Sequence, residues 1–313
     1  MKRFEGCLTG LVVGDALGQK LTGQSTVAIS TRYGDRPDLG GVEPDRYGAS
    51  SQMAMAIASS LAECSGFDGA DMASRLLGAY DPSRDYGKGT KAALRRLDDG
   101  AGWFEAGAVG GGRENFGNGA ASRSAPIGLL YGHDTDTLRW VAEESAGITH
   151  QHALATEGAV LCALAVALAI AAEGKDISGA GFLAALREET QMREFGSRLE
   201  TATAMAGRCP GATEVVERLG NNATALGSVV TAIWCFAEHP ASFENAVIRC
   251  LSLGGNAAAR TAMTGAIAGA YLGIDALPPR WLESLRWEAL SRGTIERLAA
   301  RLQAEAETLG INP

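Results

Sequence analysis

The sequence predicts an all-α fold, a single-domain orthogonal helical bundle. Three observations lead to this prediction. Apolar residues recur three and four positions apart along alanine-rich segments, which is the spacing of one helix face, and strand patterns are scarce. Glycines such as Gly18, Gly174 and Gly273 follow several segments, where a left-handed residue can end a helix. No linker rich in Pro, Gly and Ser divides the chain, so we expect one domain over residues 1–313.

The helical spacing identifies the expected elements in chain order. They are 4–17, 50–64, 69–80, 88–98, 135–147, 151–173, 226–238, 242–252, 257–272 and 292–308. The longest apolar run, 159–172, has 14 residues, whereas a membrane span takes about 20. We therefore expect a buried core helix there and no membrane segment. In 257–272, Ala and Gly recur on successive turns, so neighbouring helices can approach closely and this helix should be central.

Charge and cysteine content restrict the function classes. The chain has 28 Lys and Arg against 36 Asp and Glu, a net charge of −8, which argues against binding to nucleic acid or to an anionic membrane. Its six cysteines show no Cys-x-x-Cys spacing, so we expect reduced thiols in a cytoplasmic protein. The apolar stretch near the amino terminus contains Asp15 and lacks a cleavage site, so we expect no signal peptide.

Several motifs occur in an order that points to one family. They include Gly-Asp-Ala-Leu-Gly at 14–18 and Leu-Gly-Gly followed by a small-residue helix at 253–273, with further motifs at 86–90, 116–128, 148–152 and 219–232. Over about residues 4–290 the chain resembles the ADP-ribosylglycohydrolase family. The resemblance implies that family's all-α bundle and a central cleft that binds a small molecule.

The resemblance also implies two loops that hold a pair of Mg²⁺ ions through carboxylates, but both loops differ here. Residues 48–51 read Gly-Ala-Ser-Ser where the family has Thr-Asp-Asp-Thr, and 256–259 read Asn-Ala-Ala-Ala in place of Asp-Thr-Asp-Thr. Mg²⁺ usually needs carboxylate oxygen, whereas Ser50, Ser51 and Asn256 offer neutral oxygen only. We therefore expect no metal and no cofactor, and assign these three residues to ligand binding.

Two other segments suggest ligand sites at first sight. The Asp-Thr-Asp-Thr string at 134–137 precedes an amphipathic stretch, so we expect Asp134 or Thr135 to cap a helix rather than to bind metal. The glycine cluster at 107–112 is either a loop or a wrap for a phosphate.

Asp15, Arg260 and His150 are the candidate catalytic residues. Thr22 occupies the position nearest to that of the family's catalytic carboxylate, so Asp15 is the acid that this segment retains. The alternative for Asp15 is a structural role as a hydrogen-bond acceptor. Arg260 lies four residues after Asn256, where a guanidinium would replace the lost cationic charge and hold an anion. Its alternative is an ion pair with an acid such as Asp15.

Further ligand contacts follow from the family resemblance. Asn118, Gly119 and Arg123 match the segment that contacts ribose and phosphate, although Arg123 could instead be a surface or capping charge. His150 and His152 lie two residues apart and so point to different sides. One of them would face the cleft, to donate to a phosphate or to transfer a proton near neutral pH; the alternative for each is a hydrogen bond at the helix start.

These residues support three functional hypotheses. The first is a repurposed, metal-free cleft that acts on or binds a small, anionic or nucleotide-like molecule. The second is a non-catalytic protein that binds ADP-ribose or another metabolite, and the third is a conventional Mg²⁺-dependent ADP-ribosyl hydrolase. A structural role in binding a protein partner is a further alternative. The sequence makes no prediction of an oligomeric state.

Overall fold

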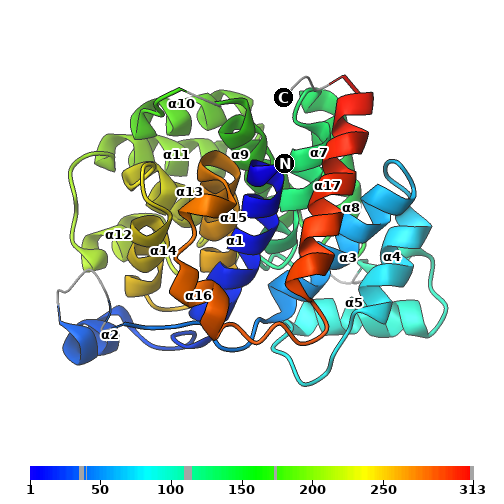
Figure 1. Ribbon diagram of the computed structural model, residues 1–313, viewed down its shortest axis with the longest axis horizontal. Helices are drawn as coiled ribbons and strands as arrows, with labels where there is room; N and C mark the ends of the chain where they lie inside the picture. The colour runs from blue at the N-terminus through cyan, green and yellow to red at the C-terminus, as the bar shows by residue number, and fades with distance from the viewer. Residues whose placement is uncertain (35–38, 40, 109–114, 173–174, 311–313) are drawn as a thin grey trace.

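The protein is a bundle of helices joined by loops in the part of the chain that the computed structural model describes, residues 1–34, 39, 41–108, 115–172 and 175–310 (Figure 1). Seventeen α-helices and two short 3-10 helices occur there, and no β-strand lies among these residues. The predicted all-α fold is confirmed.

The helices divide between the two halves of the chain. The amino-terminal half contains α1 (Lys2–Gln19), α2 (Thr26–Tyr33), α3 (Ala49–Glu63), α4 (Gly69–Gly78), α5 (Lys88–Asp98), α6 (Trp103–Ala106), η1 (Ala121–Arg123), α7 (Ala125–Tyr131) and α8 (Thr135–Gly147). The carboxy-terminal half contains α9 (Ala153–Ala171), α10 (Gly179–Glu189), α11 (Arg193–Met205), α12 (Ala212–Leu219), α13 (Val229–Glu238), α14 (Phe243–Ser252), α15 (Ala257–Leu272), η2 (Ile274–Ala276), α16 (Pro279–Ser284) and α17 (Arg292–Thr308).

The residues expected to end or to cap helices were predicted correctly in part. Gly273 ends α15 with φ of 81°, and Asp134 caps α8 by accepting from the backbone N–H groups of Asp136 and Thr137, as predicted. Gly18 does not end α1, because the helix continues to Gln19. Gly174 lies outside the described residues, as does most of the 107–112 glycine cluster.

Helices α1 and α15 lie side by side in the middle of the bundle, between α13 and α14 on one side and α17 on the other (Figure 1). Glycines make their close approach possible. A Cβ on Gly10 would lie 2.3 Å from the Gly265 carbonyl oxygen, and one on Gly14 would lie 2.1 Å from that of Thr261. The two backbones therefore touch, and α15 occupies the centre that its small residues predicted.

Helix α9 is the apolar core helix expected from the run at 159–172. By length and composition it is the one described helix that could cross a membrane, but 72% of its most apolar window is buried inside the protein. Its Glu157 is buried as well and forms a 2.7 Å ion pair with Arg139 of α8. Burial among other helices fits a core helix.

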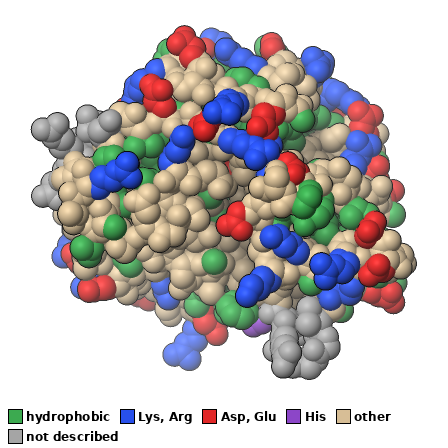
Figure 2. Space-filling model, turned by 90° about the horizontal axis from the view of Figure 1, so that it is seen from below, with side chains coloured by type: hydrophobic (Ala, Val, Ile, Leu, Met, Phe, Trp, Pro, Cys, Tyr) green, Lys and Arg blue, Asp and Glu red, His purple; other side chains and the backbone are tan. Residues whose placement is uncertain are grey.

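The mixed surface charges and the free cysteines both agree with the amino-acid composition. Basic and acidic side chains lie interspersed on the face seen from below the bundle (Figure 2). All six cysteines are free, and four of them are buried, as expected for reduced thiols. Cytoplasmic location stays a prediction.

Candidate functional site

A cleft of about 660 Å³ opens where several helices begin. Its walls come from the end of α1, the start of α3, residues 85–90 before and within α5, residues 115–119, η1, and the start of α15. Such a volume lies within the range of pockets that hold nucleotide-sized ligands.

Six of the ten predicted site residues line this cleft and four do not. Those in the cleft are Ser50, Asn118, Gly119, Arg123, His150 and Asn256. Those outside its lining are Asp15, Ser51, His152 and Arg260.

Arg260 is the main correction to the sequence-based site. It is fully buried, and its guanidinium donates to the carbonyl oxygens of Asn221 at 3.1 Å, Cys250 at 3.1 Å and Gly254 at 2.6 Å. It forms no ion pair with a described acid, and Asp15 has other partners, so neither the anion-binding role nor the pairing with Asp15 agrees with the structure. Ala258 and Ala259 face the cleft, and the next residue of a helix is turned by about 100°, which carries Arg260 into the core.

Asp15 and Ser51 form a buried structural unit beside the cleft. The Asp15 carboxylate accepts from the backbone N–H groups of Gly48 at 2.8 Å and Ser51 at 2.9 Å, and from the Ser51 hydroxyl at 2.6 Å. Burial raises the pKa of Asp15, and the hydrogen bonds from Ser51, Gln19 and Gly48 lower it in part. Asp15 thus fixes the start of α3, which is the structural role given as its alternative. Neither Asp15 nor Ser51 is placed to act on a ligand.

At the wall that the family resemblance assigns to metal binding, the polar atoms form hydrogen bonds within the protein. Asn256 Oδ1 accepts from Asn118 Nδ2 at 2.9 Å. The Thr22 hydroxyl accepts from the Ala258 backbone N–H at 2.9 Å and donates to the Gly18 carbonyl, also at 2.9 Å. The oxygens at these positions are therefore neutral and already engaged.

The same holds for the loop at the start of α3. The Ser50 hydroxyl donates to that of Ser122 at 3.0 Å, and Ala49 offers no oxygen from its side chain. Among the described residues no group of three or more His, Cys, Asp and Glu lies close enough to hold a metal ion. Mg²⁺ dehydrates reluctantly and binds through carboxylates, so this donor set does not fit the family's pair of ions.

The η1 segment of the cleft keeps a buried positive charge. The Arg123 guanidinium lies 1% exposed and donates to the Ser145 carbonyl at 3.1 Å and to the Thr149 hydroxyl at 2.8 Å. Burial lowers its pKa to about 10, so it stays protonated at neutral pH. It has no acidic partner among the described residues, and its Nε has no hydrogen-bond partner.

The sequence left open which histidine faces the cleft, and the structure places His150 there. His152 instead caps α9, where its Nδ1 accepts from the Leu154 backbone N–H at 3.1 Å. Its ring packs edge-on against Phe116, with centroids 5.7 Å apart. His152 thus makes the helix-start hydrogen bond that was its alternative and does not line the cleft, and its assignment to ligand binding stays a prediction.

Phe116 and Tyr86 are cleft residues that were not assigned to the site. Phe116 lines the cleft with half of its surface exposed, at 51%, which is uncommon for a phenyl ring. Tyr86 also lines it, and its hydroxyl donates to the Gln52 side-chain oxygen. Both lie in the motif segments 86–90 and 116–128, which is the signal that could have identified them.

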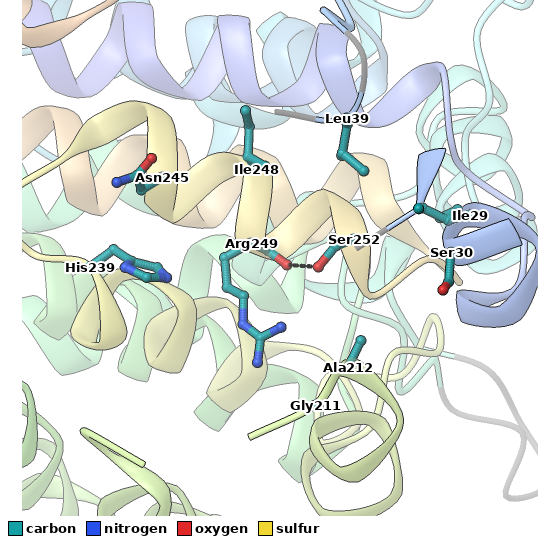
Figure 3. A pocket seen from close by; sticks show the side chains of 11 residues that line it. Ile29, Ser30, Leu39, Gly211, Ala212, His239, Asn245, Ile248, Arg249 and Ser252 are labelled. Atoms are coloured by element: carbon teal, nitrogen blue, oxygen red, sulfur yellow. Dashed lines mark hydrogen bonds between the residues drawn. The ribbon is translucent and has the colours of Figure 1, made fainter. Parts of the chain in front are cut away.

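A second cavity of about 460 Å³ lies between α2, α12 and α14 (Figure 3). Apolar side chains such as Ile29 and Ile248 share its lining with His239 and Arg249. The Arg249 guanidinium donates to the Pro210 carbonyl and lies 5.2 Å from the centre of the Trp234 ring. No residue assigned to the site from the sequence lines this cavity.

The fold and the cleft define an ADP-ribosylglycohydrolase scaffold, and residues 1–311 match the model of the ADP-ribosylglycohydrolase family. The chain belongs to this family. It is 34% identical to human ADP-ribosylhydrolase ARH3 over 91% of this chain and 89% of that protein. It is 24% identical to ADP-ribosylarginine hydrolase Tri1 of Pseudomonas putida, over 96% of this chain and 78% of Tri1. A solved ADP-ribosylglycohydrolase-related protein complex superposes with a TM-score of 0.74 at 28% identity, covering 97% and 98% of the two chains.

Proposed function

We propose that the cleft binds an ADP-ribose-like nucleotide without a metal, and that the protein recognises this ligand rather than hydrolysing it with Mg²⁺. One observation carries the proposal. At the positions where the family places metal-binding carboxylates, this chain has Ala49, Ser50, Asn256 and Ala258, and the polar atoms there are hydrogen-bonded to the protein itself.

Electrostatics supports an anionic ligand. Arg123 is a buried cation with no described acidic partner, and Lys88 adds an exposed ammonium to the same cleft. Asp85 is the one acid among the described lining residues. A buried charge without a partner is unfavourable, so a phosphate near Arg123 would improve the energy of the folded protein.

The exposed ring of Phe116 supports a ligand with a base. Stacking of a nucleobase on an aromatic side chain contributes about 1–3 kcal/mol. His152 contacts this ring edge-on, as described above. The names of the relatives, an ADP-ribosylhydrolase and an ADP-ribosylarginine hydrolase, support ADP-ribose as the ligand class.

The first experiment measures ADP-ribose binding by calorimetry in EDTA and again in Mg²⁺. We expect the same affinity in both buffers. Undetectable heat at millimolar ADP-ribose contradicts the proposal. Release of ADP-ribose from an ADP-ribosylated protein in EDTA would establish a metal-independent enzyme instead, and release only in Mg²⁺ would establish the conventional hydrolase.

The second experiment measures the melting temperature with increasing Mg²⁺. A ligand that binds only the folded state raises the melting temperature by mass action, so we expect no specific rise for this protein. The matched control restores the acidic positions by combining A49D, S50D, N256D and A258D. If this variant folds, Mg²⁺ should raise its melting temperature; a similar rise in the unaltered protein contradicts the metal-free cleft.

A further inference from the structure

A chain of buried hydrogen bonds leads from Arg123 to the cleft. One guanidinium nitrogen of Arg123 donates to the Thr149 hydroxyl, with 2.8 Å between the atoms. The same hydroxyl oxygen lies 2.6 Å from Nδ1 of His150. Because a guanidinium can only donate, Thr149 is the acceptor in the first of these contacts.

The single proton of the Thr149 hydroxyl determines which ring nitrogen of His150 carries a hydrogen. Thr149 is fully buried, and His150 Nδ1 is the only acceptor within hydrogen-bond reach of this hydroxyl among the described residues. If Nδ1 carried a hydrogen itself, the hydroxyl proton would be buried without an acceptor, which is unfavourable. Thr149 therefore donates to Nδ1, and the hydrogen of the neutral ring sits on Nε2.

The Nε2 atom opens onto the cleft beside two glycines. A Cβ on Gly119 would lie 3.3 Å from Nε2, and one on Gly117 would lie 3.5 Å from it. Side chains at either position would crowd this nitrogen, whereas glycine leaves it accessible. Nε2 has no hydrogen-bond partner among the described residues, so its donor is available to a ligand.

We propose that His150 is a neutral hydrogen-bond donor whose Nε2–H binds an acceptor oxygen of the ligand, and that Thr149 and Arg123 are positioning residues that fix this tautomer. The inference rests on the proposed function for the identity of the ligand. The pKa of His150 lies well below its ordinary value because of burial first and the Arg123 charge second. The ring is thus neutral at pH 7 and suited to binding rather than to acid catalysis.

Nitrogen NMR of protein labelled with ¹⁵N-histidine tests the tautomer directly, without any ligand. The chain has four histidines, and H150Q assigns the signals of interest by their loss. We expect a protonated, pyrrole-type Nε2 and an unprotonated, pyridine-type Nδ1 for His150, unchanged from pH 6 to pH 8. The reverse pattern, or a doubly protonated ring at pH 7, would overturn the inference.

Two variants of Thr149 separate positioning from packing. T149V keeps the shape but removes the hydroxyl, which is both the donor to His150 and the acceptor of Arg123, so we expect a mixture of tautomers and about fivefold weaker ADP-ribose binding, the value of one neutral hydrogen bond. T149S keeps the hydroxyl and should restore both. An unchanged tautomer and affinity in T149V would overturn the positioning role. Absence of ADP-ribose binding by the unaltered protein would instead contradict the proposed function, while the ligand-free NMR result would still report the tautomer.

Discussion

The contact between α1 and α15 and the cleft that it supports differ in what they require of the sequence. Between the helices, backbone touches backbone, and Gly10 and Gly265 leave no room for a side chain. In the cleft, the positions that the family resemblance assigns to metal-binding acids are Asn, Ser and Ala in this chain, and the helices that carry them are present. The fold therefore depends on small residues in the core, and it tolerates the loss of charge at the site.

Gly265→Val should have the largest effect of the substitutions considered. The new side chain would start 2.1 Å from the Gly10 carbonyl oxygen, so the two helices must separate. We expect a loss of about 4 kcal/mol in the free energy of unfolding, or insoluble protein. Urea unfolding checks this, with G78A as the control, because a Cβ on exposed Gly78 meets nothing within 4 Å. A variant as stable as the parent would contradict the close contact.

Arg260→Met should rank second. It removes a charged donor from three carbonyl oxygens, in two buried hydrogen bonds and one part-buried one, which we expect to cost about 3 kcal/mol of stability. ADP-ribose affinity should stay unchanged, because Arg260 does not line the cleft. Urea unfolding and calorimetry on the same sample give both values. A loss of affinity in a variant that retains its stability would return Arg260 to the site.

The Asp15 carboxylate gives a prediction for pH. Its pKa is raised in the folded protein by burial, so the folded state holds the proton more tightly than the unfolded state does. The stabilisation from this group is present below the unfolded pKa and is lost as the pH rises through the folded pKa. Relative to D15N, the parent should therefore lose stability as the pH rises from 3 upward until it passes the folded pKa. Urea unfolding at several pH values tests the sign, and a parallel pair of curves would contradict it.

Phe116→Ala should have a smaller effect, confined to the cleft. Loss of one stacked base predicts about tenfold weaker ADP-ribose binding with little change in stability, since the ring is half exposed. Phe104 is a matched control, because it is also an exposed phenylalanine, at 62%, and does not line the cleft. Equal affinities for F116A and F104A would remove base stacking from the proposal.

Sequence periodicity predicted most of the large helices, and some with the observed bounds. Segments 88–98, 135–147, 257–272 and 292–308 agree with α5, α8, α15 and α17. Helices α2, α6, α7, α10, α11, α12 and α16 were missed. Five of them, α2, α6, α7, α12 and α16, have between four and eight residues, too few for the spacing to repeat clearly.

The site was predicted less well because direction is harder to infer than position. The motif order identified the loops that line the cleft, including those with Asn118, His150 and Asn256. Arg260 lies one helix position beyond the cleft-lining Ala259, so its side chain enters the core instead of the cleft. The Asp15 carboxylate binds backbone N–H groups instead of facing a ligand. Both outcomes depend on neighbours from distant parts of the chain, which spacing within one segment does not show.

The pairing of α1 with α15 joins segments from opposite ends of the chain. During synthesis α1 leaves the ribosome before α15, and the intervening residues take on the order of tens of seconds to be made at ordinary elongation rates. Its apolar residues and glycine face are uncovered for that time. Nascent chains that stall before α15 emerges should therefore be the species that most need a chaperone.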